Sequence, residues 1–257
     1  MTTSTSADLF DLTGKRVLVT GASRGIGQAI SVGLAQRGAR VVGAARSVEG
    51  LKETAGLVAD GPGSFQPYAV DLRSPESIDA CIAAAVEELG GLDVLVNNAA
   101  DDHDSSIEDT DLATFQRVLE LNLQSCWLLL RAASPHLKAS EGRVINIASI
   151  LGLVAIRNDT AYISAKHALI GLTKAVALEW ARQGVRVNAV CPGYVETSML
   201  PDLEANEPVA KYIRRMTPMG RWAQPGEYIG PAVFLASDAS SFMTGQTLVV
   251  DGGLTAQ

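Results

Sequence analysis

Cysteine and histidine are scarce in this chain of 257 residues, with three of each. Cys81, Cys126 and Cys191 are odd in number, far apart and without C-x-x-C spacing, so we expect three reduced thiols rather than disulfides. The acidic run DDHDSS around His103 leaves a metal site open, but a solvated loop is the more common meaning of such a run. We predict no metal.

Long hydrophobic runs and an excess of basic charge are also missing. No stretch reaches the roughly 18 apolar residues that a membrane span needs, and the start MTTSTSADLF has neither the basic nor the apolar region of a signal peptide. The net charge of −7 argues against a general binder of nucleic acid or anionic membranes. We therefore expect a cytoplasmic protein whose partner is a small molecule.

Short apolar runs rich in Val and Ile recur along the chain and alternate with amphipathic segments. Seven such runs are typical of strands buried on both faces: residues 15–20, 39–44, 67–70, 92–97, 143–148, 185–190 and 247–250. Helices are expected near residues 25–37, 74–90, 112–137, 160–182 and 226–237. The alternation predicts a doubly wound α/β fold, a seven-stranded parallel sheet with helices on both faces. We expect one domain over residues 1–257, with a flexible tail at residues 1–10.

The segment TGASRGIGQAI follows the first predicted strand. Gly21, Gly25 and Gly27 give the spacing G-x-x-x-G-x-G, a variant of the Rossmann-type dinucleotide fingerprint. Glycine permits the tight turn and the close approach of backbone amides to a pyrophosphate at a helix N-terminus. The whole loop is expected to contact the cofactor: Gly21, Ser23, Arg24, Gly25, Ile26 and Gly27.

The end of the second strand bears on the choice of cofactor. A carboxylate there would bind the ribose hydroxyls of NAD, whereas arginine would bind the 2′-phosphate of NADP. Ala45 occupies the expected acidic place and is followed by Arg46 and Ser47, while Arg24 adds a second positive charge from the glycine loop. This predicts NADP(H), with NAD(H) as the alternative if both arginines are merely solvated.

Taken together, the motifs resemble those of the short-chain dehydrogenase/reductases from about Asp11 to Gly253. The matching segments stand in the family's order and spacing: TGASRGIG, VNNAA, LNL, INIAS, YISAK and VCPGYVETSM. The start LFDLTGK and the C-terminal tail are most similar to the gluconate 5-dehydrogenase branch.

This resemblance implies a role for each matching position. Tyr162 would be the general acid/base, Lys166 its partner on the nicotinamide ribose, Ser149 the group that holds the substrate oxygen, and Asn122 the residue that orders a water behind the lysine. The remaining cofactor contacts would come from the ends of later strands, where NNAA replaces the usual NNAG: Asp71, Leu72, Asn98, Ala99, Ala100, Pro192, Gly193, Val195 and Thr197. Tyr194 and Met199 would touch the substrate, and residues 200–222 would form a lid.

Tyr162 and Lys166 are four positions apart and therefore lie on one helical face. A free tyrosine has a pKa near about 10 and is a poor base at neutral pH. We expect the lysine ammonium, together with the oxidised nicotinamide ring, to lower the pKa of the phenol.

The sequence thus predicts an NADP(H)-dependent oxidoreductase that interconverts a secondary alcohol and a ketone, on the resemblance a sugar acid. Two alternatives remain, a 3-oxoacyl thioester reductase and a catalytically silent NADP(H)-binding sensor. Lys211, Arg214 and Arg215 of the lid could attract an acidic substrate, although a solvated helical face is the simpler meaning. The resemblance implies a homotetramer, and apolar residues of the 160–182 helix suit either a subunit interface or the core: Leu169, Leu172, Val176 and Trp180.

Overall fold

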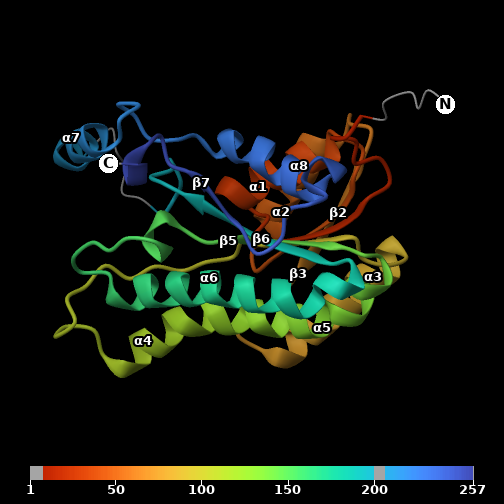
Figure 1. Cartoon of the computed structure of the whole chain (residues 1–257), viewed down its shortest axis with the longest axis horizontal. Helices are drawn as coiled ribbons and strands as arrows, with labels where there is room; N and C mark the ends of the chain where they lie inside the picture. Colours follow the sequence, from red (N-terminus) through yellow and green to blue (C-terminus); the bar gives the residue numbers. More distant parts are fainter. Residues whose placement is uncertain (1–7, 200–205, 257) are drawn as a thin grey trace.

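All seven strands lie in one parallel sheet (Figure 1), in a computed structural model that describes residues 8–199 and 206–256. The sheet order is β3-β2-β1-β4-β5-β6-β7. The strands are β1 (Arg16–Thr20), β2 (Arg40–Ala45), β3 (Ser64–Ala69), β4 (Val94–Asn97), β5 (Arg143–Ile147), β6 (Arg186–Pro192) and β7 (Thr247–Val250). The predicted doubly wound Rossmann-type sheet is confirmed, and its order reverses between β1 and β4, where such sheets bind ligands.

Helices cover both faces of the sheet (Figure 1). One face carries α1 (Gly25–Ala35), α2 (Val48–Val58) and α8 (Ile229–Ala236). The other carries α3 (Pro75–Leu89), α4 (Leu112–Leu119), α5 (Ser125–Ala139) and α6 (Thr160–Trp180), and α7 (Glu207–Met216) lies beyond the carboxyl ends of the strands. Short 3₁₀ turns occupy η2 (Ile150–Gly152), η3 (Ala181–Gln183), η4 (Pro225–Tyr228), η5 (Asp238–Ser240) and η6 (Leu254–Ala256).

Two apolar cores follow from the alternation of side chains along each strand. On β1, Val17 and Val19 pack toward α1 and α8, whereas Leu18 packs toward α3 and α5. Leu18 stands in register with Val42 of β2 and Leu95 of β4, so equivalent positions of neighbouring strands enter the same core.

Helix α3 shows how local sequence sets the boundaries of an element. The Ser74 side chain accepts a hydrogen bond from the Ser77 amide, Pro75 opens the helix, and Gly90 ends it in the left-handed conformation. Other boundaries differ from prediction. Strand β3 begins at Ser64 rather than Pro67, because an edge strand tolerates a proline that cannot donate. Helix α2, capped by Ser47, was not predicted.

The helix expected over residues 112–137 is present, but it contains a π-helical turn that the sequence did not predict. This turn, η1 (Glu120–Gln124), separates α4 from α5. The turn contains Asn122, whose Nδ2 donates to the Val118 carbonyl at 2.9 Å and so supplies a donor inside the widened turn. The π-helical turn leaves the apolar periodicity of the segment nearly unchanged, because a side chain takes over part of the backbone hydrogen bonding. The sequence pattern therefore does not reveal the turn.

A buried polar ladder joins β4, β5 and α6. Asn97 Nδ2 donates to Asn146 Oδ1, and Asn146 Nδ2 donates to Thr173 Oγ1, both at 2.9 Å. All three side chains are buried, where unpaired amides would be costly. The ladder therefore fixes how α6 sits on the sheet.

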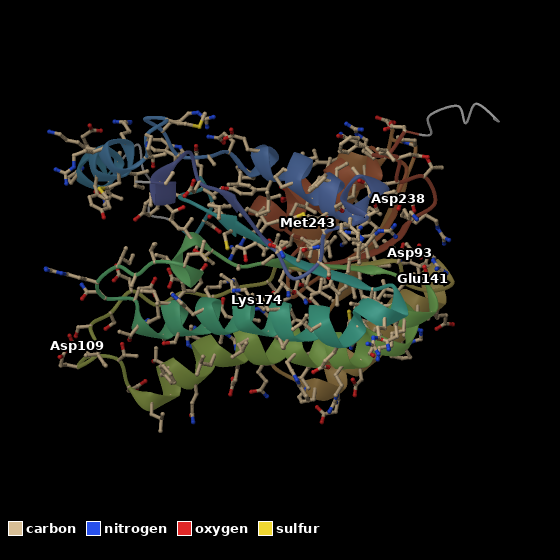
Figure 2. All side chains as sticks on the ribbon, viewed as in Figure 1. Asp93, Asp109, Glu141, Lys174, Asp238 and Met243 are labelled. Carbon is tan, nitrogen blue, oxygen red and sulfur yellow. The ribbon has the colours of Figure 1, made fainter. Side chains whose placement is uncertain are left out.

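Two ion pairs connect elements at the end of the sheet where the strands begin. Arg16 pairs with Asp93 at 2.7 Å, and Arg143 pairs with Asp238. Figure 2 shows Asp93 and Asp238 at one end of the molecule and Asp109, in the loop after β4, at the other.

The apolar stripe of α6 faces the core. Leu169, Val176 and Trp180 are buried within the chain, and Leu172 is partly buried against the same core, so these residues pack in the core of the chain itself. Within the described residues, no helix is long and apolar enough to cross a membrane. Residues 1–7 of the predicted tail and 200–205 of the predicted lid lie outside the described residues; at position 9, the Leu9 carbonyl accepts a hydrogen bond from the Ala239 amide.

Candidate active site

The glycine loop between β1 and α1 is tightly packed. Gly21 and Gly25 have φ values of 67° and 56°, which favour glycine. A Cβ on Gly27 would lie 2.2 Å from the Gly21 carbonyl oxygen, so no side chain fits there. Ser23 and Ile26 are partly exposed along the same loop.

The N-terminus of α1 fits a phosphate group. Its N-cap residue is the exposed Arg24, no side chain in the described part of the chain caps it, and its first turn holds no acidic residue. Free amides, a positive helix end and a guanidinium together favour an anion. These residues therefore fit the pyrophosphate of a dinucleotide.

The ends of β2 and β3 lie next in the sheet. Ala45 is buried, while Arg46 and Ser47 are exposed; Ser47 Oγ accepts from the Gly50 amide and caps α2. Asp71 is exposed and accepts from the Arg73 amide at 3.0 Å, and Leu72 is buried. Arg46 and Asp71 are therefore both open to solvent at the carboxyl ends of neighbouring strands.

The end of β4 braces the glycine loop. Asn98 Nδ2 donates to the carbonyls of Thr20 at 2.9 Å and Gly21 at 3.2 Å. The Thr20 hydroxyl in turn accepts from the amides of Asn98 and Ala99. Ala100, like Ala99, is partly exposed. Asn98 thus holds the loop through its own amide. Thr20 was missed by sequence reasoning because a buried strand threonine carries no distinctive pattern.

The segment after β6 lies against the glycine loop. The Thr197 Cγ2 atom would be 3.2 Å from a Cβ on Gly25, so the two loops are in contact. Three further predicted cofactor contacts precede it: Pro192, Gly193 and Val195, of which Pro192 and Val195 are buried. Tyr194 packs beneath α7 in an apolar cluster, and Met199 is exposed.

Tyr162 and Lys166 occupy adjacent turns of α6. Tyr162 is 8% exposed and Lys166 is 2% exposed. Lys166 Nζ lies 5.2 Å from the centre of the Tyr162 ring and donates to the Ile147 carbonyl at 3.1 Å. A buried lysine and a buried phenol thus stand together beyond the end of β5.

In the protein without cofactor the pKa of Tyr162 lies above its ordinary value; the lowering expected from Lys166 and the oxidised nicotinamide together stays a prediction. Burial raises the pKa of the phenol most, the nearby Asp102 carboxylate raises it further, and a hydrogen bond with Ser149 lowers it. Burial also lowers the pKa of Lys166 to about 8, because an ammonium in a dry site is disfavoured. Without the nicotinamide ring, the second cation on which the expectation relied, the phenol stays protonated at neutral pH.

Ser149 and Asn122 both precede this pair in the chain. Ser149 follows β5 and its hydroxyl accepts from the Leu151 amide at 3.1 Å. Asn122 is fully buried; its Oδ1 has no hydrogen-bond partner among the described residues, although its Nδ2 donates to the Asp101 carbonyl at 2.6 Å. Buried acceptors are normally satisfied, so this oxygen suits a water.

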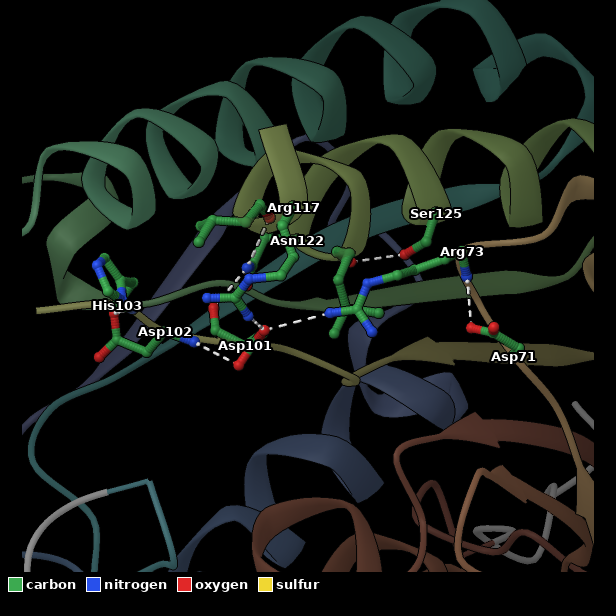
Figure 3. A network of polar contacts seen from close by, with 10 residues as sticks. Asp71, Arg73, Asp101, Asp102, His103, Arg117, Asn122 and Ser125 are labelled. Carbon is green, nitrogen blue, oxygen red and sulfur yellow. Dashed lines mark hydrogen bonds and ion pairs between the residues drawn. The ribbon is translucent and has the colours of Figure 1, made fainter. Parts of the chain in front are cut away.

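Asp101 links three elements behind the site (Figure 3). Its carboxylate pairs with Arg73 at 3.2 Å and with Arg117 of α4. Its carbonyl receives the Asn122 amide described above. The loop after β4 is therefore tied to α4, to the π-helical turn and to the segment before α3.

Two carboxyl groups that sequence reasoning missed lie close to Tyr162. Asp159 is 4% exposed and its Oδ1 has no partner among the described residues. Burial, Asp102 and Asp104 raise the pKa of Asp159 to about 8. The acidic run DDHD after NNAA and the aspartate three residues before Tyr162 were the available signals.

The other predicted features have ordinary roles. In the described part of the chain, no group of His, Cys, Asp and Glu could hold a metal, and His103 acts electrostatically on Asp111. Arg214 stacks on Trp222 at 5.1 Å and pairs with Glu207 at 3.5 Å, whereas Lys211 and Arg215 are exposed.

Comparisons with known proteins agree with this geometry. The family described as Enoyl-(Acyl carrier protein) reductase matches residues 21–255. The chain is 41% identical to a 2-dehydro-3-deoxy-D-gluconate 5-dehydrogenase of Bacillus subtilis, over 96% of each chain. It is 39% identical to the 3-oxoacyl-(acyl-carrier-protein) reductase FabG of Vibrio cholerae, over 95% of this chain and 98% of the relative.

A solved structure is similarly close. It is described as a putative NAD(P)-dependent gluconate 5-dehydrogenase from Beutenbergia cavernae with bound NADP at low occupancy. Its TM-score is 0.92 and its sequence identity 43%, covering 97% of this chain and all of that one. The fold and the predicted family are therefore confirmed together.

The raised pKa of Asp159 predicts a pH-dependent stability. The folded protein binds this proton more tightly than the unfolded chain, so stability is full below about pH 4 and is lost as the pH rises toward about 8. Asp159→Asn removes the titration. As the pH rises from about 5 to about 8, the wild type should therefore lose about 1–3 kcal/mol of unfolding free energy that the variant keeps.

Urea unfolding at both pH values measures this difference, with Glu108→Gln in an exposed loop as control. Equal changes for wild type and Asp159→Asn across the pH range would contradict the raised pKa.

Proposed function

Because the chain belongs to the short-chain dehydrogenase/reductase family, we propose that it is an NADP(H)-dependent oxidoreductase that interconverts a secondary alcohol and a ketone. The observation that carries the proposal is the burial of Tyr162 and Lys166 on adjacent turns of α6, beside Ser149. Burying a phenol and an amine together costs free energy of folding. Proton transfer to a substrate oxygen is a function that explains why the chain keeps them there.

The cofactor would be held by the ends of five strands. The glycine loop and the uncapped start of α1 would bind the pyrophosphate, and Arg24 and Arg46 would bind the 2′-phosphate. Asp71 and Leu72 would meet the adenine, and the segments 98–100 and 192–197 would meet the nicotinamide half. When bound, the dinucleotide gives or takes the hydride.

The protein itself handles the proton. The raised pKa keeps Tyr162 protonated at neutral pH, so it can donate a proton to a ketone oxygen. Ser149 would hydrogen-bond the same oxygen and fix its position. Lys166, with a pKa near about 8, can accept or release a proton close to neutral pH. The unpaired Asn122 oxygen would order a water between the amine and solvent.

A small polyhydroxylated ketone, including a sugar acid, is the substrate that the relatives favour. The support is the 41% identity with a sugar-acid dehydrogenase. Reduction of a 3-oxoacyl thioester is the second candidate, since a relative of that activity is 39% identical. A panel of keto sugars and oxoacyl thioesters, followed by NADPH absorbance, separates the two. A silent sensor would turn over neither.

Two larger features belong to the same proposal. Residues 206–222, which include α7, would cover the substrate, since Tyr194 packs against Ala210, Ile213 and Trp222. We also propose a cytoplasmic homotetramer formed by one domain. Trp127 of α5 and Leu178 of α6 are exposed apolar side chains that could meet a second copy, and the three cysteines are free thiols.

Removal of the Tyr162 hydroxyl tests the catalytic assignment. Tyr162→Phe keeps the buried ring but cannot donate a proton, so kcat should fall by roughly 10²–10⁴-fold. NADPH affinity, measured by cofactor fluorescence, should stay within about twofold because the cofactor contacts are retained. Turnover at the parent rate would rule out Tyr162 as the proton donor.

Removal of the Arg46 guanidinium tests the cofactor assignment. Arg46→Ala should weaken NADPH binding by about tenfold or more and leave NADH binding unchanged, since only NADPH carries the 2′-phosphate. Arg37→Ala, an exposed arginine that precedes β2, is the matched control. Equal losses for both cofactors, or none, would count against NADP(H) preference.

A further inference from the structure

Asp159 occupies the N-cap position of α6, three residues before Tyr162, but its side chain does not cap the helix. An N-cap aspartate normally accepts a hydrogen bond from the helix amides. Here the residue is 4% exposed, and Oδ1 lacks a partner among the described residues. Helix capping therefore does not explain why a carboxyl group is buried at this position.

A second loop brings a second carboxyl group to the same place. The Ser105 amide donates to the Asn158 carbonyl at 2.6 Å, and Ser105 forms a bridge with Asp159. These contacts join the loop after β4 to the start of α6. As a result, the Asp102 carboxylate lies close enough to Asp159 to raise its pKa, because two neighbouring carboxyl groups favour a state in which they carry one proton between them.

The carboxyl pair lies near the reacting groups, since Asp159 precedes Tyr162 by three residues at the start of α6. Asp102 and Asp159 both act electrostatically on the Tyr162 phenol, and Asp159 also acts on Tyr194. The charge of Asp102 also acts on Lys166, whose pKa it raises. The negative charge of the pair therefore acts on the Tyr162 phenol and on the neighbouring Tyr194.

The carboxyl pair forms no salt bridge in the described part of the chain, and neither does Asp104. The nearest arginines in the network, Arg73 and Arg117, are engaged with Asp101 instead (Figure 3).

We propose that Asp159, paired with Asp102, determines substrate specificity: it accepts a hydrogen bond from a hydroxyl or ammonium group on the carbon next to the substrate carbonyl, and it excludes a carboxylate from that position. The inference rests on the proposed function. It assigns the hydroxyl-bearing end of a polyol-derived ketone to the start of α6. If the substrate is a sugar acid, its carboxylate binds at the opposite end.

Three small ketones that differ in one group test the proposal. Hydroxyacetone, aminoacetone and acetoacetate share CH₃–CO–CH₂– and carry a hydroxyl, an ammonium and a carboxylate. Wild type should reduce the first two with kcat/KM at least about tenfold above that for acetoacetate, because a charge next to a like charge is strongly disfavoured. NADPH absorbance gives the rates, and cofactor fluorescence reports NADPH binding independently.

The double substitution Asp102→Asn with Asp159→Asn should shrink the preference for aminoacetone over acetoacetate by about tenfold, since it removes the shared charge and keeps the shape. Each single variant keeps one carboxyl group that can ionise, so it should keep most of the preference, which gives a second readout if the double variant folds poorly. Glu108→Gln removes an exposed carboxylate of the same loop and should leave the ratio unchanged.

A preference for acetoacetate in wild type, or an equal effect of the double substitution on all three ketones, would overturn the specificity role alone. Binding of NADPH without reduction of any of the three ketones or of the keto-sugar and thioester panel would overturn the proposed function as well.

Discussion

The burial of a lysine beside a phenol is the constraint on which the rest of the site depends. Neither Lys166 nor Tyr162 is stable in a dry interior in its charged form. Burial moves the pKa of Lys166 down to about 8 and that of Tyr162 up. Without cofactor the phenol is consequently neutral at neutral pH, whereas the amine is still mostly protonated but close to its pKa, so each can change its protonation state when a charge is placed nearby.

Holding such a pair in place requires polar support on every side. The Asn97–Asn146–Thr173 ladder fixes α6 against the sheet. From the loop after β4, Asp101 connects two arginines and, through its backbone, Asn122 (Figure 3). The glycine loop is braced separately by Asn98. The cofactor site and the proton-transfer site therefore share the carboxyl edge of one sheet but are held by different hydrogen bonds.

Much of this arrangement could be predicted from the sequence, because strands, glycine turns and helix caps are encoded locally. Ser74, Pro75 and Gly90 mark the ends of α3 through their own backbone preferences. What could not be predicted depends on tertiary contacts. The π-helical turn at Asn122 needs the Val118 and Asp101 carbonyls. Asp102 and Asp159 are 57 positions apart, and only the folded loops bring their carboxyl groups together.

The direction of the Tyr162 pKa is the most direct test of this view of the site. The tyrosinate absorbance of the cofactor-free protein, titrated for wild type and for the phenylalanine variant, isolates this one phenol by difference. The difference signal should stay at zero through neutral pH and appear only above the ordinary tyrosine pKa of about 10. A phenolate that titrates below that value in the absence of cofactor would contradict a buried, protonated proton donor.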